Sequence, residues 1–279
     1  MTKQEVNTYF EEQAAAFPGK VAYLYASMEQ AEEADVLTDC EMTPGHIFSA
    51  HGEERVVSAS TVKVPVMMAL LERLEKEHIP VQTKISVKAE QILEDSRVFE
   101  YGPREASFEE LIVWMIVNSD NTSTNVLLQY LGFDAYNQYF RKIGLRETKV
   151  ERLMLDFEAV EAGYNNYISP MDYYRCMLLL WQNRNQDPKA KLALDILKRN
   201  RDYDSLCRYL YEGPVVAHKS GGLDDIVHDA GIFWMQKSNY FLGVFVSEFK
   251  PEQKMEKEAE KLVGRLSRKV YDLELEQEA

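Results

Sequence analysis

The chain has 279 residues, of which 46% are hydrophobic, and its 32 Lys and Arg against 46 Asp and Glu give a formal net charge of −14. This length is enough for a substantial core in one large domain or in two closely packed subdomains. Such an acidic surface repels phosphate backbones and anionic lipids, and no run reaches the roughly 18 apolar residues of a membrane-spanning helix, so we expect neither nucleic acid nor a membrane as a partner.

The chain opens with a predicted helix that is followed by strands. Residues 2–16 have the periodicity of an amphipathic helix, and residues 20–28 alternate with the β-branched and aromatic composition of a strand. An acidic loop or hairpin over 29–45 leads to a second expected strand near 46–50. The N-terminal residues lack the apolar segment of a signal peptide, so the expected compartment is the cytoplasm. An export segment upstream of the given sequence would change that expectation.

A block of helices follows in the middle of the chain. Residues 60–78 are apolar on almost every side as far as Leu71, which is typical of a buried helix. Ser107 and Glu110 form a capping-box pattern ahead of an apolar run, and residues 122–132 predict a further helix, with another short one before Gly144.

The last part of the chain returns to strands. Residues 146–168 lack periodicity and predict a long irregular loop, after which Ser169 and Pro170 begin another helix. Three strands joined by short turns, and therefore antiparallel, precede a long closing helix; these elements cover residues 214–221, 229–236, 240–248 and 251–277.

This order of elements predicts an α+β fold. An antiparallel sheet subdomain, built from about 1–58 and 212–279, is flanked by the N- and C-terminal helices, and an all-helical subdomain is inserted over about 59–211. A cleft between the two subdomains is the expected place for a site. The oligomeric state is left open, with a monomer as the default.

The three cysteines give no sign of a metal or disulfide site. Cys40, Cys176 and Cys207 are far apart and odd in number, and the sequence contains no Cys-x-x-Cys pair or other metal-ligand spacing. They are expected to be idle thiols in a reducing compartment, and neither a metal nor a cofactor is expected.

Chemistry is indicated first by Ser60 and Lys63, which begin the buried helix one turn apart. A spacing of three places both side chains on one helix face. A desolvated lysine has a lowered pKa and can accept a proton from a neighbouring serine, which then becomes a nucleophile. The structural alternative is that Ser60 only caps the helix and that the side chain of Lys63 extends to the protein surface. Ser-x-x-Lys is weak evidence alone, because about one match is expected by chance in such a chain, and Ser247 to Lys250 also fits it.

Two further motifs strengthen the functional interpretation. Ser119-Asp-Asn121 lies between two predicted helices, and Lys219-Ser-Gly221 lies at the end of a predicted strand. Each such tripeptide is expected on the order of 0.1 times by chance. The three motifs, in this order, resemble the signature of the class A β-lactamases and penicillin-binding proteins, a family of serine hydrolases. The resemblance extends from about residue 20 to the C-terminus and implies the β-lactamase/transpeptidase-like fold.

The resemblance implies a role for each motif residue. Ser60 would be the acylated nucleophile and Lys63 its base or proton relay, while Ser119 would pass a proton to the leaving nitrogen. Lys219 would lower the pKa of Ser119 and attract a substrate carboxylate. Three further residues would bind the substrate. Asn121 would hydrogen-bond the substrate and also contact Lys63, and Ser220 would bind the carboxylate. The backbone N–H of Gly222 would form the oxyanion hole together with that of Ser60.

The deacylation machinery is less clear in the sequence. Class A β-lactamases hold the hydrolytic water with a glutamate and, four residues later, an asparagine. Glu161 and Asn165 have that spacing, whereas alignment on Arg152-Leu153 places Phe157 at the expected position with Glu158 beside it. Glu158 and Glu161 therefore both stay candidates for the deacylation base, beside the alternative that both are solvated acids.

The strand after Lys219 departs from the family pattern as well. Such enzymes often add an arginine there as a second contact to the substrate carboxylate, but Val227 and His228 occupy this region. His228 is interpreted as structural rather than as a residue at the edge of the site. His218, directly before Lys219, is expected to face the other side of the sheet.

The predicted function is that of a cytoplasmic serine hydrolase that acts through an acyl-serine, with a β-lactam or related amide or ester as its small-molecule substrate. One alternative is a D,D-peptidase-like or small-ester hydrolase that β-lactams acylate without fast turnover. Another is a non-catalytic binding or sensing domain.

Overall fold

A five-stranded antiparallel sheet forms one side of the computed structural model, which describes residues 1–29, 47–211 and 213–278. Cys40 and nearly all of the predicted acidic loop lie outside the described residues. The strands are ordered β2-β1-β9-β8-β7, so the two ends of the chain build one sheet, as predicted. Their bounds are β1 Lys20–Ser27, β2 Ile47–Ala50, β7 Val215–Leu223, β8 Ile226–Trp234 and β9 Tyr240–Ser247.

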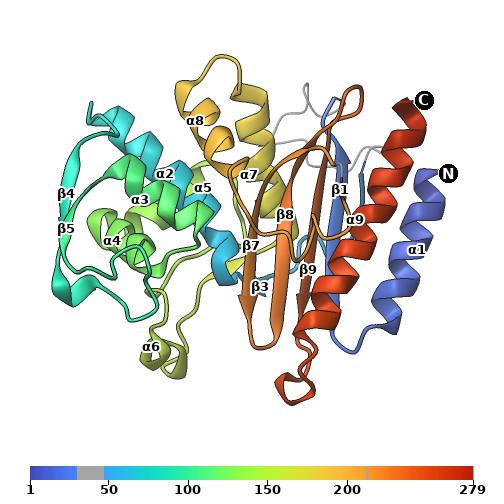
Figure 1. Ribbon diagram of the computed structural model, residues 1–279, viewed down its shortest axis with the longest axis horizontal. Helices are drawn as coiled ribbons and strands as arrows, with labels where there is room; N and C mark the ends of the chain where they lie inside the picture. Colours follow the sequence, from blue (N-terminus) through green and yellow to red (C-terminus); the bar gives the residue numbers. More distant parts are fainter. Residues whose placement is uncertain (30–46, 212, 279) are drawn as a thin grey trace.

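Both faces of the sheet are covered, which explains why its central strands are buried along almost their whole length. All eight residues of β9 are buried. Helices α1 (Lys3–Ala16) and α9 (Glu256–Glu278) run side by side over one face, while α7 (Pro170–Asn183) lies against the other (Figure 1). Apolar residues of α1 and α9 are buried against the sheet, in agreement with the predicted amphipathic helices.

The remaining helices form the inserted part of the chain, at the left of Figure 1. Helix α2 (Lys63–Lys76) is buried on all sides as far as Leu71, as its composition predicted. Ser107 and Glu110 form the predicted capping box, and Ser169 caps α7 with Pro170 in its first turn. The other helices of this part are α3 Phe108–Val117, α4 Asn121–Leu131, α5 Phe133–Lys142 and α8 Pro188–Leu197.

Short strands also occur within the insert and directly before it, which the sequence did not indicate. Strand β4 (Lys84–Val87) pairs with β5 (Arg104–Ser107), and β3 (Val56–Val57) pairs with β6 (Tyr167–Ile168). The predicted irregular loop therefore ends in a strand, and it also contains α6 (Phe157–Glu161). Strands of two to four residues are too short to show a period of two.

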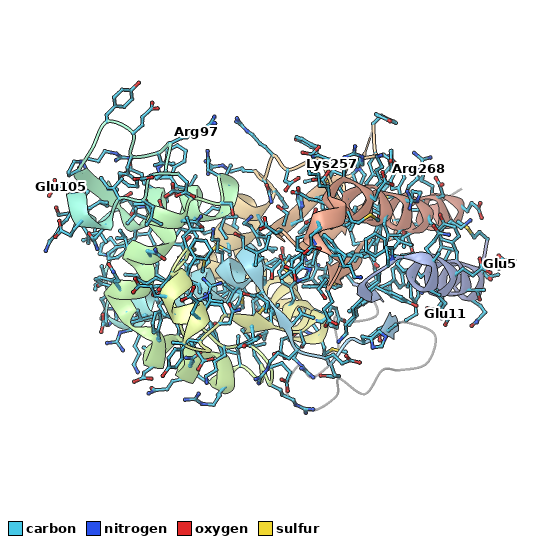
Figure 2. The ribbon with its side chains drawn as sticks, turned by 90° about the horizontal axis from the view of Figure 1, so that it is seen from below. Glu5, Glu11, Arg97, Glu105, Lys257 and Arg268 are labelled. Atoms are coloured by element: carbon cyan, nitrogen blue, oxygen red, sulfur yellow. The ribbon has the colours of Figure 1, made fainter. Side chains whose placement is uncertain are left out.

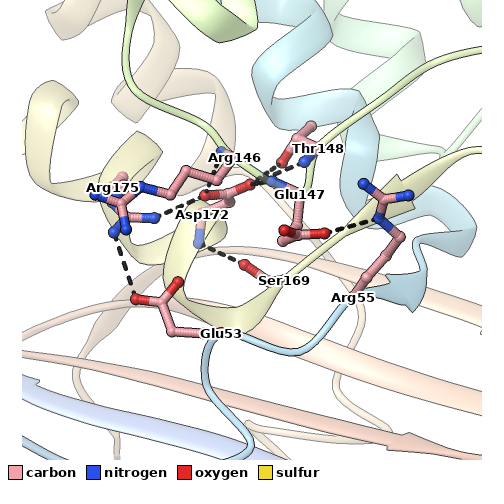
Figure 3. Close-up of polar contacts among 8 residues, drawn as sticks. All are labelled: Glu53, Arg55, Arg146, Glu147, Thr148, Ser169, Asp172 and Arg175. Atoms are coloured by element: carbon pink, nitrogen blue, oxygen red, sulfur yellow. Dashed lines mark hydrogen bonds and ion pairs between the residues drawn. The ribbon is translucent and has the colours of Figure 1, made fainter.

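The buried carboxylate of Asp172 anchors the start of this loop to α7 (Figure 3). It accepts hydrogen bonds from the backbone N–H groups of Arg146, Glu147 and Thr148, at 3.1, 2.7 and 2.8 Å. Arg175, one turn further along α7, donates to the same carboxylate at 2.8 Å. A charged carboxylate that accepts from this many donors holds the start of the loop against α7.

Charged side chains occupy the outer surface of the terminal helices. Figure 2 shows Glu5 and Glu11 on α1 and Lys257 and Arg268 on α9. Within the described ranges, no helix combines the length and the apolar run that crossing a bilayer requires.

Candidate active site

Ser60 lies in a 3-10 turn, η1 (Ala59–Val62), which leads directly into α2. The preceding Ala59 has a φ of 45°, in the left-handed region that costs a residue with a Cβ atom about 1 kcal/mol or more. The turn packs against β7 near the middle of the molecule (Figure 1). Ser60 is half-buried, so its hydroxyl is held on a rigid support and still faces the site.

The amine of Lys63 is at the centre of a hydrogen-bond network. Its side chain is 0% exposed, and Nζ donates to the carbonyl oxygen of Ser119 at 2.6 Å, to Ser119 Oγ at 3.1 Å and to Asn121 Oδ1 at 2.9 Å. Burial lowers the pKa of Lys63 well below its ordinary value, and the charge of Lys219 lowers it further. A buried lysine of this kind can be neutral and can act as a base.

Ser119 connects this amine to Ser60. Its Oγ donates to Ser60 Oγ at 2.9 Å. Ser119 has a φ of 53° in the turn between α3 and α4, and in this conformation both its carbonyl and its hydroxyl face Lys63. The next residue, Asp120, secures the turn because its carboxylate accepts from Ser123 N at 2.6 Å and from Ser96 Oγ at 2.5 Å.

The Lys219 motif approaches the turn from β7. Lys219 is 2% exposed and donates from Nζ to the carbonyl of Ser220 at 2.8 Å. Burial lowers its pKa to about 8, although the charges of Asp202 and Asp229 act in the opposite direction. A Cβ atom on Gly221 would lie 2.8 Å from the backbone nitrogen of Ser60. Glycine at this position therefore lets β7 approach the nucleophile turn closely.

The structure brings together most of the residues predicted from the motifs. Ser60, Lys63, Ser119 and Asn121 form one hydrogen-bonded group, and Lys219 lies near enough to act on the charge of Lys63. The exposed Gly222 follows Gly221 at the open end of β7.

Glu158 and Glu161 stand apart from that group. Both are exposed residues of α6, at the lower edge of Figure 1. Among the described residues, no hydrogen bond or ion pair joins either carboxylate to Ser60, Lys63 or Ser119. The stem of their loop is nevertheless close to the nucleophile, because Ser58 N donates to Asn166 O at 2.9 Å.

The two histidines near β7 have structural surroundings. His228 is fully buried, donates from Nε2 to the Val57 carbonyl at 3.1 Å, and has its pKa lowered to about 4 by burial. It is therefore neutral at pH 7. Nδ1 of His218 lies 2.8 Å from Asp229 Oδ1, which gives it surroundings different from those of its neighbour Lys219, as the strand alternation predicted.

Two carboxylates at the site were missed by the sequence reasoning. Asp95 Oδ2 accepts from Asn121 Nδ2 at 2.9 Å, and the carboxylate of Asp202 accepts from the Ser220 hydroxyl. Asp95 lies before the capping-box helix and Asp202 in the segment between α8 and β7. Neither belongs to a local motif, so only the folded arrangement reveals them.

Comparisons with known proteins find relatives along most of the chain. The chain matches the family model of the beta-lactamase enzyme family over residues 3–273. It is 25% identical over 239 residues to a beta-lactamase of Bacteroides uniformis, which covers 76% of this chain and 77% of that protein.

Solved structures show the same fold. A beta-lactamase from Chitinophaga pinensis superposes with a TM-score of 0.84 at 21% identity, covering 96% of this chain and 99% of that one. A structure of PBP-A superposes with a TM-score of 0.82 at 22% identity and covers 99% and 98% of the two chains.

Proposed function

Because the chain belongs to the beta-lactamase enzyme family, we propose that Ser60 is its nucleophile and Lys63 its general base. The protein is a serine hydrolase of the β-lactamase type, and its substrates are small molecules. The assignment of residues rests above all on one observation. A fully buried lysine is connected to Ser60 through the hydroxyl of Ser119.

Acylation begins with a proton transfer along this network. Neutral Lys63 accepts the proton of Ser119 while Ser119 accepts that of Ser60, since hydroxyl groups rotate to exchange donor and acceptor roles. Ser60 Oγ attacks the carbonyl carbon of the β-lactam amide and forms a tetrahedral intermediate. The backbone N–H groups of Ser60 and Gly222 stabilise its oxyanion.

Collapse of the intermediate breaks the C–N bond. Ser119 passes a proton to the leaving nitrogen and regains one from Lys63, so the lysine returns to its neutral form. Lys219 keeps positive charge beside Ser119 and so favours its proton transfer. Asn121 accepts from Lys63 through Oδ1 and donates to Asp95 through Nδ2, and the second hydrogen of its NH₂ group orients the substrate's own amide.

Deacylation requires a water molecule to attack the ester carbonyl of acylated Ser60. The base that takes a proton from this water is proposed to be either Glu158 or Glu161. The variants Glu158→Gln and Glu161→Gln test which of the two has this role. The variant that accumulates an acyl adduct identifies the base. A wild-type adduct that persists for hours favours instead the peptidase-like alternative, in which β-lactams acylate without fast turnover.

Hydrolysis of nitrocefin tests the proposed nucleophile. The wild-type protein is expected to open the lactam ring and Ser60→Ala to lose this activity, while both keep the same melting temperature. Ring opening by Ser60→Ala at the wild-type rate would overturn the assignment. A wild-type protein that neither opens the ring nor forms an adduct would favour the non-catalytic binding domain.

A further inference from the structure

The hydroxyl of Ser220 already has an acidic partner in the folded protein. It donates to Oδ2 of Asp202, at the end of β7 where the motif would bind the carboxylate of a β-lactam. A serine hydroxyl has one proton to donate and two lone pairs to accept with. Because the Ser220 hydroxyl donates its one proton to the hydrogen bond with Asp202, it can only accept a hydrogen bond from a ligand.

Asp202 is held in this position by the segment between α8 and β7. Its Oδ1 accepts from the backbone N–H of Asp204 at 3.0 Å, and its own N–H donates to Asn200 Oδ1 at 3.1 Å. Asn200 is 7% exposed and donates from Nδ2 to the His218 carbonyl on β7 at 3.0 Å. The carboxylate is thus fixed to the strand that carries Ser220.

The surrounding charges do not supply an excess of positive charge for an anion. Lys219 directly precedes Ser220, and among the charged groups Asp202 has the largest effect on the pKa of Lys219, which it raises against the effect of burial. His228, across the strand pair from Gly221, is buried and neutral. Arg201 is exposed and lines a hollow of about 850 Å³ together with Trp114 of α3. A second carboxylate, that of Asp95, accepts from Asn121, whose Oδ1 accepts in turn from Lys63.

We propose that Asp202 is a specificity-determining residue, which directs the enzyme toward substrates with a neutral hydrogen-bond donor, such as a carboxamide, where common β-lactams carry a carboxylate. This inference rests on the proposed function of Ser60. An incoming carboxylate would meet a fixed carboxylate and a serine without a proton to offer. The N–H group of a carboxamide would donate to Ser220 Oγ and would not be repelled.

A matched pair of thioesters tests this proposal. Both carry the same acylaminoacetyl group, and the leaving thiol is thioglycolate in one and the neutral thioglycolamide in the other. The quantity of interest is the ratio of kcat/KM for the carboxamide substrate to kcat/KM for the carboxylate substrate. Asp202→Asn is expected to lower this ratio at least about tenfold, mainly because the carboxylate substrate reacts faster. Comparing variant with wild type cancels the intrinsic reactivity of the two thioesters.

Asp204→Asn is the matched control. It removes the same charge two residues away, where the side chain is 71% exposed and its carboxylate lies 3.7 Å from Arg208. Its ratio is expected to stay within about twofold of wild type, because exposed charges are screened. A second measurement needs no variant: the wild-type ratio should fall as the salt concentration is raised from about 0.05 to about 0.5 M.

The outcomes separate this inference from the proposed function. Ser60-dependent turnover with an unchanged ratio in Asp202→Asn would overturn the role of Asp202 and leave the function intact. If Asp202→Asn does not fold, a wild-type ratio that does not respond to salt overturns the inference. Absence of Ser60-dependent turnover of both thioesters would remove the proposed function, and the inference with it.

Discussion

The hydroxyl of Ser119 donates a 2.9 Å hydrogen bond to the hydroxyl of Ser60. Lys63 reaches Ser119 at 3.1 Å, and within the described part of the chain it has no direct hydrogen bond to Ser60. In the proposed mechanism Lys63 therefore acts on Ser60 through a second serine. Removal of either the base or the intermediate hydroxyl should interrupt the same proton route.

Lys63→Ala and Ser119→Ala are each expected to slow acylation by about 10²- to 10⁴-fold, the usual contribution of a positioned acid or base. The double variant should be little slower than either single one, because groups that act as a unit are not additive. Stopped-flow acylation by nitrocefin measures all three. A Ser119→Ala variant that acylates at the wild-type rate would mean that Lys63 acts on Ser60 without the relay.

The pKa of Lys219, lowered to about 8, predicts the alkaline limb of the pH–rate profile. Lys219 is charged below this pH and neutral above it, so acylation should decline as the pH rises through about 8. Lys219→Arg keeps its charge at all these pH values, and its decline should move to higher pH. A wild-type rate that stays constant to about pH 10 would show that the charge of Lys219 is not used.

Gly221→Ala should disturb the nucleophile turn, since the new Cβ atom would lie 2.8 Å from Ser60 N and 3.1 Å from Thr61 N. Displacing the turn should lower kcat/KM at least about 10²-fold. Gly52→Ala, where the nearest atom is 3.4 Å away, is the control and should keep its activity. Equal activities of the two variants would contradict the close approach of β7 to Ser60.

Asp172→Asn is expected to destabilise the fold by about 3 kcal/mol, the typical cost of removing one partner from a buried ion pair. The variant loses the charge that faces Arg175 at 2.8 Å. Urea unfolding measures the change. The control Glu53→Gln alters an acid that is 54% exposed and 3.4 Å from the same arginine, and it should cost less than about 1 kcal/mol. Similar losses in the two variants would contradict the anchoring role of Asp172.

The three consecutive strands near the C-terminus and the helix caps were predictable because their sequence signals are local. Ser107 and Ser169 each accept the N–H of the residue three positions further on, and Pro170 has no N–H that needs a partner. The motif residues were predictable for a similar reason, since Ser60 and Lys63 share one turn and the other motifs are contiguous.

The parts that were missed depend on contacts between distant segments. Asp95 and Asp202 lie 26 and 18 residues from their site partners Asn121 and Ser220, and neither belongs to a recognisable pattern. The choice between Glu158 and Glu161 depends on how α6 sits against the site, which the spacing of residues in a loop does not determine.

Acid-quenched intact-mass spectrometry during reaction with penicillin G detects the acyl-enzyme itself. We expect an adduct with the mass of one complete penicillin molecule, located by peptide mapping on Ser60, formed before product and absent from Ser60→Ala. Product released by Ser60→Ala, or an adduct on another residue, would contradict the claim that catalysis proceeds through acylation of Ser60.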